Sequence, residues 1–210
     1  MFKRHQRAGI NLIMRMQTQE GECAAFKDDR GRFTSDINKT NTLKLRASSA
    51  YTVSVESPAG TCVRSMSVQG VPVGMSHEPA HSSSGSAGNG VVSTGVWRTD
   101  GYKPSLQSCR EKLEFVFVVQ GGGVRGPASD DSHLLQAKLL CKFYAPEDAK
   151  FGQKGAALGA VKLRAAIGAT SHITAVTFAD HAHMGHLMGA GDNLTSSASV
   201  HGPDALEPAG

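Results

Sequence analysis

The sequence predicts an all-β protein, folded as an antiparallel β-sandwich or flattened barrel. Apolar and polar residues alternate over many short runs, and turn-forming residues separate these runs without a convincing helical period between them. The runs at 41–46 and 50–56 show this most clearly, because their apolar residues occupy alternate positions, as in half-buried strands. The chain has 210 residues, which is the length of one domain with tails.

The first strand is expected at 10–17. Its apolar positions are Ile10, Leu12, Met14 and Met16. The basic segment 1–8 has a composition that a mitochondrial presequence would share, but the alternation beyond it favours a strand of the domain. We therefore expect a basic extension at 1–8 and a β-sandwich domain at 9–180. A DDRG turn signal follows the first strand, with one or two short strands around Phe26 and Phe33.

Two further strands are expected at 61–68, which holds Val63, Met66 and Val68, and at 91–98, where strand-forming residues resume. Between them, VQGVPVG forms a tight reversal, and Pro72 is expected at an edge or turn because it has no amide hydrogen for a strand ladder. The Ser/Gly-rich insertion at 77–90 is expected to be a loop, because it holds too little apolar surface to order itself.

The densest apolar run, LEFVFVV at 113–119, is expected to be a central strand because both of its faces are apolar apart from one glutamate. The segment HLLQAKLLCKFY at 133–144 is ambiguous, since Leu, Gln, Ala and Lys favour a helix. We nevertheless favour a strand, because alternate residues then form one apolar side. These residues are Leu135, Ala137, Leu139, Cys141 and Phe143. Runs at 160–167 and 172–178 complete about nine or ten strands.

Motifs for catalysis or cofactor binding are weak. GGGVRG at 121–126 fits a dinucleotide fingerprint, but PASDDSH follows it where a phosphate-binding helix would be needed, so a hairpin loop is expected. His181, His183 and His186 have spacings that suit metal ligands, but they lie in a Gly/Ser/His-rich tail at 181–210 that is expected to be disordered. No nucleophile, base and acid occur in the chain order that a known catalytic-triad family uses. We expect no enzyme activity, no cofactor and no metal site.

Charge and hydropathy exclude other classes of protein. The net charge of +4 is too small and too scattered to predict nucleic-acid binding. No run approaches the roughly 18 to 20 apolar residues that cross a bilayer, so no transmembrane segment is expected. The four cysteines form no CxxC pair, which indicates isolated thiols in a reducing compartment. Large aromatic residues are expected to fill the core, and Trp97 is the one most suited to a role other than core packing, such as a binding contact.

Several segments resemble the cannabinoid-receptor-interacting protein family in their order and spacing. The likeness covers about residues 9–148, with a weaker continuation to 178. The segments that carry it are INLIMRMQTQEGECAAFKDDRGRF (10–33), NTLKLRASSAYTVSVES (41–57), MSVQGVPV (66–73), VVSTGVWRTDGYKPS (91–105), LEFVFVV (113–119) and LLQAKLLCKFYAPED (134–148). The insertion, the Gly-rich loop and the tail depart from the family pattern.

The resemblance implies a sandwich similar to that of Rho GDP-dissociation inhibitors. It also implies a non-catalytic cytoplasmic adaptor, at the inner face of the plasma membrane, that binds the cytoplasmic tail of a cannabinoid-type receptor and dampens its signalling. The alternative is a carrier that shields the lipid chain of an acylated or prenylated protein between its sheets. A cavity of some hundreds of cubic ångströms between the sheets would favour the carrier, and a filled core the adaptor.

A monomer is expected in either case, without nucleic acid as a partner. Partner or lipid contacts are expected from Trp97, Phe115, Phe117, Leu139 and Tyr144.

Overall fold

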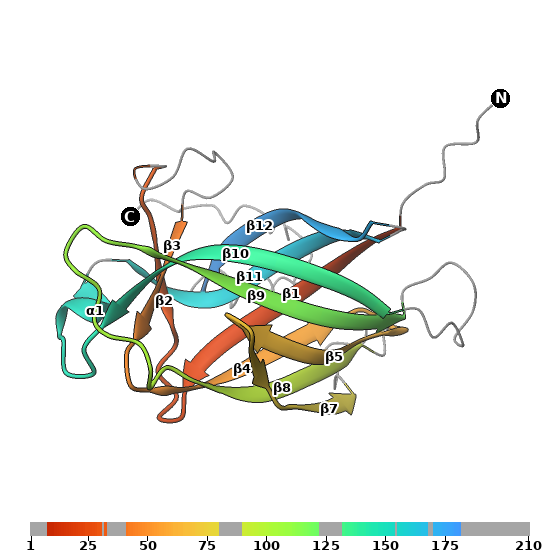
Figure 1. Cartoon of the computed structure of the whole chain (residues 1–210), viewed down its shortest axis with the longest axis horizontal. Coiled ribbons are helices and arrows are strands. Elements are labelled where there is room, and N and C mark those ends of the chain that lie inside the picture. The colour runs from red at the N-terminus through yellow and green to blue at the C-terminus, as the bar shows by residue number, and fades with distance from the viewer. Residues whose placement is uncertain are drawn as a thin grey trace, which may run out of the picture.

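The computed structural model describes residues 8–30, 32, 41–79, 90–121, 132–153, 155–167 and 170–181. In this part of the chain the secondary structure is almost entirely β, so the predicted all-β class is confirmed (Figure 1). The expected strand around Phe33, the Gly-rich loop beyond Gly121 and the tail beyond His181 lie outside the described residues.

Twelve strands and one short helix are described, against the nine or ten strands expected. The added strands are short pieces at turns. The elements are β1 (Ala8–Thr18), β2 (Ala25–Asp28), β3 (Asn41–Arg46), β4 (Ala50–Ser57), β5 (Thr61–Val68), β6 (Val71–Val73), β7 (Met75–Pro79), β8 (Val91–Arg98), β9 (Glu111–Gly121), β10 (Ser132–Tyr144), α1 (Lys150–Gln153), β11 (Ala156–Ile167) and β12 (His172–Asp180).

The strands form one continuous sheet that folds over itself into two layers (Figure 1). The hydrogen-bonded order is β6-β5-β9-β10-β3-β2-β11-β1-β4-β8-β7, and β12 pairs with β11. The strands from β6 to β2 form one layer and those from β11 to β7 the other, and the layers are joined where β2 pairs with β11. Among the described strands the pair β3–β10 is parallel, and the others are antiparallel. The sheet does not close, because β6 and β7 end the path, and this agrees with a sandwich or flattened barrel.

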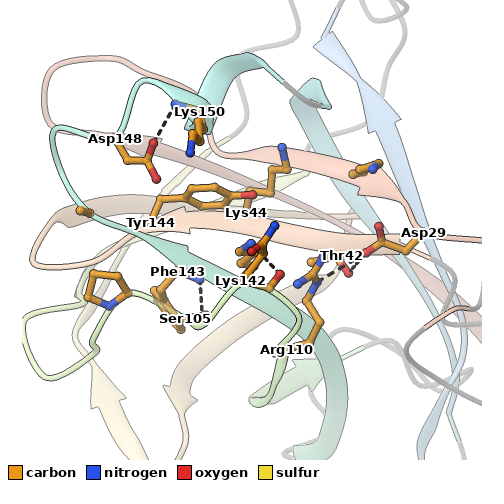
Figure 2. Close-up of a pocket in the computed structure, with 14 residues that line it drawn as sticks. Asp29, Thr42, Lys44, Ser105, Arg110, Lys142, Phe143, Tyr144, Asp148 and Lys150 are labelled. Atoms are coloured by element: carbon orange, nitrogen blue, oxygen red, sulfur yellow. Dashed lines mark hydrogen bonds and ion pairs between the residues drawn. The ribbon is translucent and has the colours of Figure 1, made fainter.

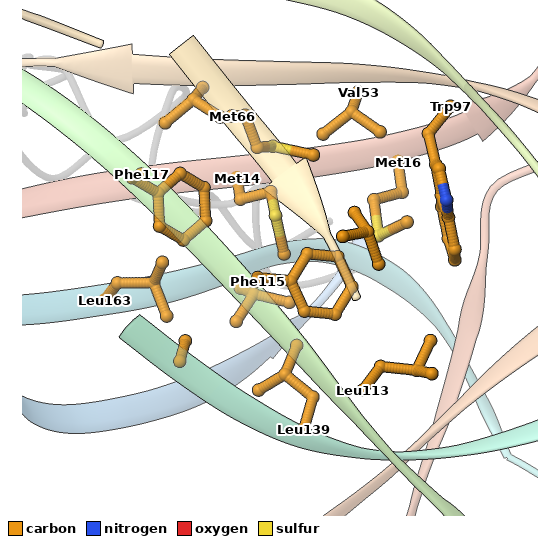
Figure 3. Packing of buried hydrophobic residues seen from close by; sticks show 14 of the residues in the cluster. Met14, Met16, Val53, Met66, Trp97, Leu113, Phe115, Phe117, Leu139 and Leu163 are labelled. Atoms are coloured by element: carbon orange, nitrogen blue, oxygen red, sulfur yellow. The ribbon is translucent and has the colours of Figure 1, made fainter. Parts of the chain in front are cut away.

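The core lies between the two layers and is formed by the alternate residues of each strand (Figure 3). Met14 and Met16 of β1 enter it from one layer, and Phe115 and Phe117 of β9 enter it from the other, all with almost no exposed surface. Full burial of such a side chain contributes roughly 1.5–3 kcal/mol relative to its exposure. The apolar side chains at every second residue of the strands therefore hold the two layers together.

The two most apolar segments fold as expected, with one difference. β10 is a strand, and its predicted apolar side from Leu135 to Phe143 is buried, so the helical alternative for 133–144 is wrong. β9 lies between β5 and β10, as expected for a central strand. However, only one of its faces is fully buried, because Val116 and Val118 on the other face are only partly covered.

The expected loop at 77–90 begins later than the sequence indicated. His77 to Pro79 belong to β7, which pairs with β8 so that His77 lies opposite Ser93. Gly95 permits this pairing, because a Cβ atom there would lie 2.5 Å from the carbonyl oxygen of Gly74. Pro72 lies in β6, which ends the sheet path, and this confirms the expected edge position. The rest of the insertion, 80–89, lies outside the described residues.

Candidate functional site

A cleft with a strongly basic lining lies on the outer face of the β2–β3–β10 layer (Figure 2). Its volume is about 520 Å³. Five cationic side chains and two carboxylates line it, together with Thr42, Pro104, Ser105, Gln107, Phe143, Tyr144 and Ala145. The charged residues are Lys27, Lys44, Arg110, Lys142, Lys150, Asp29 and Asp148. Because these residues are far apart in the sequence, only the fold gathers them.

The strand registers explain why the cations meet. In the parallel pair, Lys44 of β3 lies directly opposite Lys142 of β10. Side chains that alternate with them, such as Leu43 and Phe143, are buried, so the two lysines extend from the outer face. Lys27 of β2 is added to this face by its register opposite Thr42.

Lys44 is the innermost of these cations. It is only 3% exposed, and its ammonium nitrogen has no hydrogen-bond acceptor among the described residues. The ring of Tyr144 lies against it, with 5.4 Å from the nitrogen to the ring centroid. On another side the chain passes close at Gly155, where a Cβ atom would lie 3.3 Å from the nitrogen and 2.5 Å from the carbonyl oxygen of Phe26. Gly155 also has a φ of 141°, which suits glycine.

The electrostatic environment of Lys44 disfavours its charge. Burial lowers the pKa of the ammonium group from 10.5 to about 8, and repulsion from Lys27 and Lys142 contributes to this lowering of the pKa. Asp29 acts in the opposite direction, but it does not outweigh the other effects. Burial also lowers the pKa of Lys142, and its ammonium group donates to the carbonyl oxygen of Gln107 at 3.2 Å.

Both carboxylates of the cleft are engaged elsewhere. Asp29 accepts a hydrogen bond from the Thr42 hydroxyl at 2.5 Å and lies 3.5 Å from Nε of Arg110. Asp148 accepts the backbone amide of Lys150 at 2.8 Å, which caps the short helix α1. The protein therefore supplies no carboxylate hydrogen bond to Lys44 from the described residues.

The segment 99–110 forms one wall of the cleft and is fastened to β10. The backbone amide of Ser105 donates to the carbonyl oxygen of Phe143 at 2.9 Å, and the Ser105 hydroxyl accepts the Phe143 amide at 3.0 Å. Tyr102 stacks on Phe143 with 4.4 Å between the ring centroids. These contacts fix the position of the wall relative to the lysines of β3 and β10.

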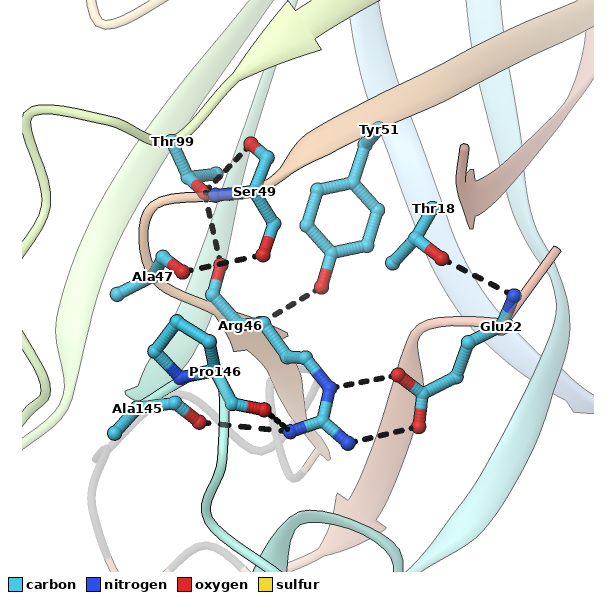
Figure 4. A network of polar contacts seen from close by, with 9 residues as sticks. All are labelled: Thr18, Glu22, Arg46, Ala47, Ser49, Tyr51, Thr99, Ala145 and Pro146. Atoms are coloured by element: carbon cyan, nitrogen blue, oxygen red, sulfur yellow. Dashed lines mark hydrogen bonds and ion pairs between the residues drawn. The ribbon is translucent and has the colours of Figure 1, made fainter. Parts of the chain in front are cut away.

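A polar network holds the end of β3 next to the cleft (Figure 4). Arg46 makes a two-pronged ion pair with Glu22, at 2.6 Å and 3.0 Å, and its Nη1 donates to the carbonyl oxygen of Pro146. The backbone amide of Arg46 donates to the hydroxyl of Tyr51, whose pKa burial raises to about 12. Strands β3 and β4, the turn after β1 and the segment after β10 are thereby joined at this end of the sandwich.

A second candidate region lies where the sheet fails to close. A shallow cavity of about 560 Å³, wide open to solvent, lies between β5 and β7. It is lined by Cys62, Arg64, His77, Glu78, Pro79, Gly90 and Val91. Among the described strands, β7 pairs only with β8, and most of its residues are exposed. One edge of β7 therefore presents backbone groups that no described strand pairs.

A family model for CB1 cannabinoid receptor-interacting protein 1 matches residues 4–178 of the chain. The chain belongs to this family. The match covers all of the described strands except the last two residues of β12. The resemblance predicted from the sequence is therefore confirmed. A search of curated proteins finds no match to the chain.

In this member of the CB1 cannabinoid receptor-interacting family, the residues expected to contact a partner or lipid lie in two places. Trp97, Phe115, Phe117 and Leu139 belong to the buried core, where the ring centroids of Trp97 and Phe115 lie 5.9 Å apart. Tyr144 instead lines the basic cleft. Their roles in binding stay a prediction, and the structure brings the first four together and separates them from Tyr144.

Sequence reasoning missed the cations of the cleft in this family member. Lys44 and Lys142 each lie within a strand, at a position that alternates with buried residues. That signal marks each as outward-facing, but the parallel register that brings the two together is not visible in the sequence.

The described residues of this family member form no recognisable metal site. They include no group of three or more His, Cys, Asp or Glu side chains placed to hold a metal ion. His183 and His186 lie outside this part of the chain.

The four cysteines are free thiols, and burial strongly raises the pKa of the Cys141 thiol. No helix in the described ranges has the length and apolarity to cross a membrane.

Proposed function

We propose that this protein is a non-catalytic adaptor that binds the cytoplasmic tail of a membrane receptor of the CB1 cannabinoid type and dampens its signalling. The family match over residues 4–178 carries this proposal, because the family is named for its interaction with that receptor. The adaptor acts as a monomer in the cytoplasm, at the inner face of the plasma membrane. It needs no cofactor, and it does not bind nucleic acid.

The packing between the layers supports an adaptor in preference to a lipid carrier. A carrier needs room between its sheets for an acyl or prenyl chain. Phe115 and Phe117 are fully buried there and Leu139 nearly so, and they lie against methionines of β1 and β5 (Figure 3). These side chains line neither the basic cleft nor the cavity between β5 and β7. The protein's own core thus occupies the position where a carrier would hold its cargo.

The edge of β7 is the surface we propose for the receptor tail. A peptide that adds as a strand to an open sheet edge gains main-chain hydrogen bonds, and neighbouring pockets take its alternate side chains. β7 pairs with β8 alone among the described strands, and the cavity beside Cys62 and His77 borders it. An extended tail thus pairs with β7 and lays alternate side chains against this shallow cavity.

Calorimetric titration of the full chain with a synthetic peptide of the CB1 receptor's cytoplasmic tail tests the proposal. A peptide of the same composition in scrambled order is the control, and a palmitoylated form of the tail peptide separates the adaptor from the carrier. We expect saturable binding of the unlipidated tail peptide and none of the scrambled peptide. Binding of only the palmitoylated peptide, or of neither, would overturn the adaptor proposal.

A further inference from the structure

The buried ammonium group of Lys44 has no explanation in the proposed adaptor function. An ion buried without a partner raises the free energy of the folded protein, because it loses hydration without gaining a compensating contact. Lys44 is 3% exposed and lacks an acceptor among the described residues, yet it lines an open cleft of about 520 Å³. The missing acceptor is supplied most simply by an anionic ligand in that cleft.

We propose that this cleft binds a phosphorylated small-molecule group, either a soluble polyol phosphate or the headgroup of a phosphoinositide lipid, with Lys44 as the innermost contact to its phosphoryl oxygens. Lys142, which lies opposite Lys44 in the strand register, lines the cleft from β10 and adds its charge there. Lys27 and Lys150 line the cleft on the sides of β2 and α1. Arg110 keeps its ion pair with Asp29 and contributes its charge.

The charge of the lining favours phosphate over a single carboxylate. Five cations face two carboxylates, and those two are already engaged by Thr42, Arg110 and the cap of α1. A phosphate monoester carries a charge of about −1.5 to −2 at neutral pH and offers three strong acceptor oxygens, so it satisfies several ammonium groups at once. A carboxylate offers one charge and leaves most of the lining unbalanced.

The shape and walls of the cleft favour a compact ligand. Residues of β2, of the segment 104–110 and of the segment 145–150 line the cleft beside β3 and β10, and the cleft is open on the outer face of the layer, where a small ligand can enter (Figure 2). The volume is well above the roughly 30 Å³ of one water molecule, which leaves room for a ring that carries the phosphate. Tyr144, whose ring centroid lies 5.4 Å from the Lys44 nitrogen and 5.1 Å from the Lys142 nitrogen, adds apolar surface to the lining.

This site is distinct from the surface proposed for the receptor tail, because it is formed by β2, β3 and β10 rather than by β7. Its test therefore needs no receptor peptide. If phosphate binding fails, the adaptor proposal stands, and if tail binding fails, the phosphate site stands.

Calorimetry of the full chain with inositol trisphosphate and with inorganic phosphate, each up to millimolar concentration, tests the site. The variant Lys44→Met keeps the length of the side chain and removes its charge, and Lys142→Met is a second variant in the cleft. The matched control is Lys162→Met, which removes the same charge from an exposed position of β11. Charge-assisted hydrogen bonds are strong enough that we expect each cleft variant to weaken inositol trisphosphate binding about tenfold or more, and the control to leave it unchanged.

Vesicles of phosphatidylcholine, with and without phosphatidylinositol bisphosphate, distinguish the two sources of the ligand. Binding to the phosphoinositide vesicles that soluble inositol trisphosphate displaces identifies a lipid headgroup, and binding of the soluble compound alone identifies a polyol phosphate. Either result supports the site if Lys44→Met weakens that binding about tenfold or more and Lys162→Met does not. The proposal is overturned if neither soluble probe binds the wild-type chain, if Lys44→Met and Lys162→Met bind equally, or if only a phosphorylated peptide binds.

Discussion

The side chain of Lys44 places a positive charge inside the protein, and the folded state is less stable as a result. We predict that Lys44→Met raises the free energy of unfolding by about 1–3 kcal/mol at neutral pH, because an apolar chain of similar length replaces an unpaired buried ion. Urea denaturation of the ligand-free variant and of the wild type measures this difference. A variant that unfolds at lower urea concentration than the wild type would show that the charge of Lys44 does not destabilise the fold.

The pH dependence of that difference follows from the pKa of Lys44. The pKa is 10.5 for the unperturbed side chain and about 8 in the folded protein, where burial and the charges of Lys27, Lys142, Arg110 and Asp29 act on it. Below pH 8 the group is charged in both states, so the full penalty applies. Between these two pKa values the folded protein has released the proton and the unfolded chain has not, so the penalty falls as pH rises. The advantage of Lys44→Met should therefore shrink between pH 8 and 10.5, as urea denaturation across this range would measure.

Thr99, which lies in a segment that resembles the family (91–105), supports the site through its hydrogen bonds. It is fully buried, its hydroxyl accepts the backbone amide of Ser49 at 2.9 Å, and it lies 2.9 Å from the carbonyl oxygen of Arg46 (Figure 4). Thr99 thus fastens the start of the segment that forms the wall of the cleft to the turn between β3 and β4. In the sequence Thr99 is an ordinary polar residue, but in the structure it holds the cleft wall and the turn between β3 and β4 together.

At the scale of elements, β7 provides a direct test of strand addition. Successive amides of an antiparallel strand point alternately toward its partner and away from it, so either Ser76 or His77 turns its amide away from β8. Proline at that position removes a donor for the added peptide and leaves the β7–β8 ladder intact. We predict that one of Ser76→Pro and His77→Pro keeps wild-type stability but weakens binding of the receptor-tail peptide about fivefold or more.

Alanine variants supply the control for this prediction. Ser76→Ala keeps the backbone amide and lies outside the cavity lining, so it should bind the peptide as the wild type does in the same calorimetric titration. His77 lines the cavity, so its matched comparison is His77→Ala, which keeps the amide and should bind more tightly than His77→Pro if the amide of residue 77 points away from β8. If both proline variants fold and bind with unchanged affinity, the tail does not pair with β7, and the proposed binding surface is wrong.

The elements themselves were largely predictable from the sequence, since period-two burial decides between strand and helix wherever one face packs on a core. In β10 this pattern outweighed the helical propensity of Leu, Gln, Ala and Lys. β7 was missed because its exposed residues carry no burial pattern, and its pairing depends on Gly95 in β8. The basic cleft was not predictable, because it depends on the parallel register of β3 with β10, and these strands are about a hundred residues apart.

At the scale of the whole molecule, the sheet joins the two ends of the described chain. β1 pairs with β11 on one side and with β4 on the other, and β11 also connects the two layers through two residue pairs with β2. Folding must therefore bring together segments that are far apart in the sequence, as is typical of slow-folding all-β topologies. The layers cannot enclose the core until β11 is in place.

Two truncated chains test this dependence on β11. β12 pairs only with β11 among the described strands and has no fully buried residue, whereas β11 buries Leu158, Val161 and Leu163 and bridges β2 to β1. We predict that a chain ending after Ile167, which lacks β12, keeps a cooperative thermal transition at reduced temperature. A chain ending after Gln153, which also lacks β11, should lose cooperative unfolding in circular dichroism, because the core residues of β11 and its pairing with β1 and β2 are then missing. Equal behaviour of the two truncated chains would show that β11 does not have the joining role that the sheet order assigns to it.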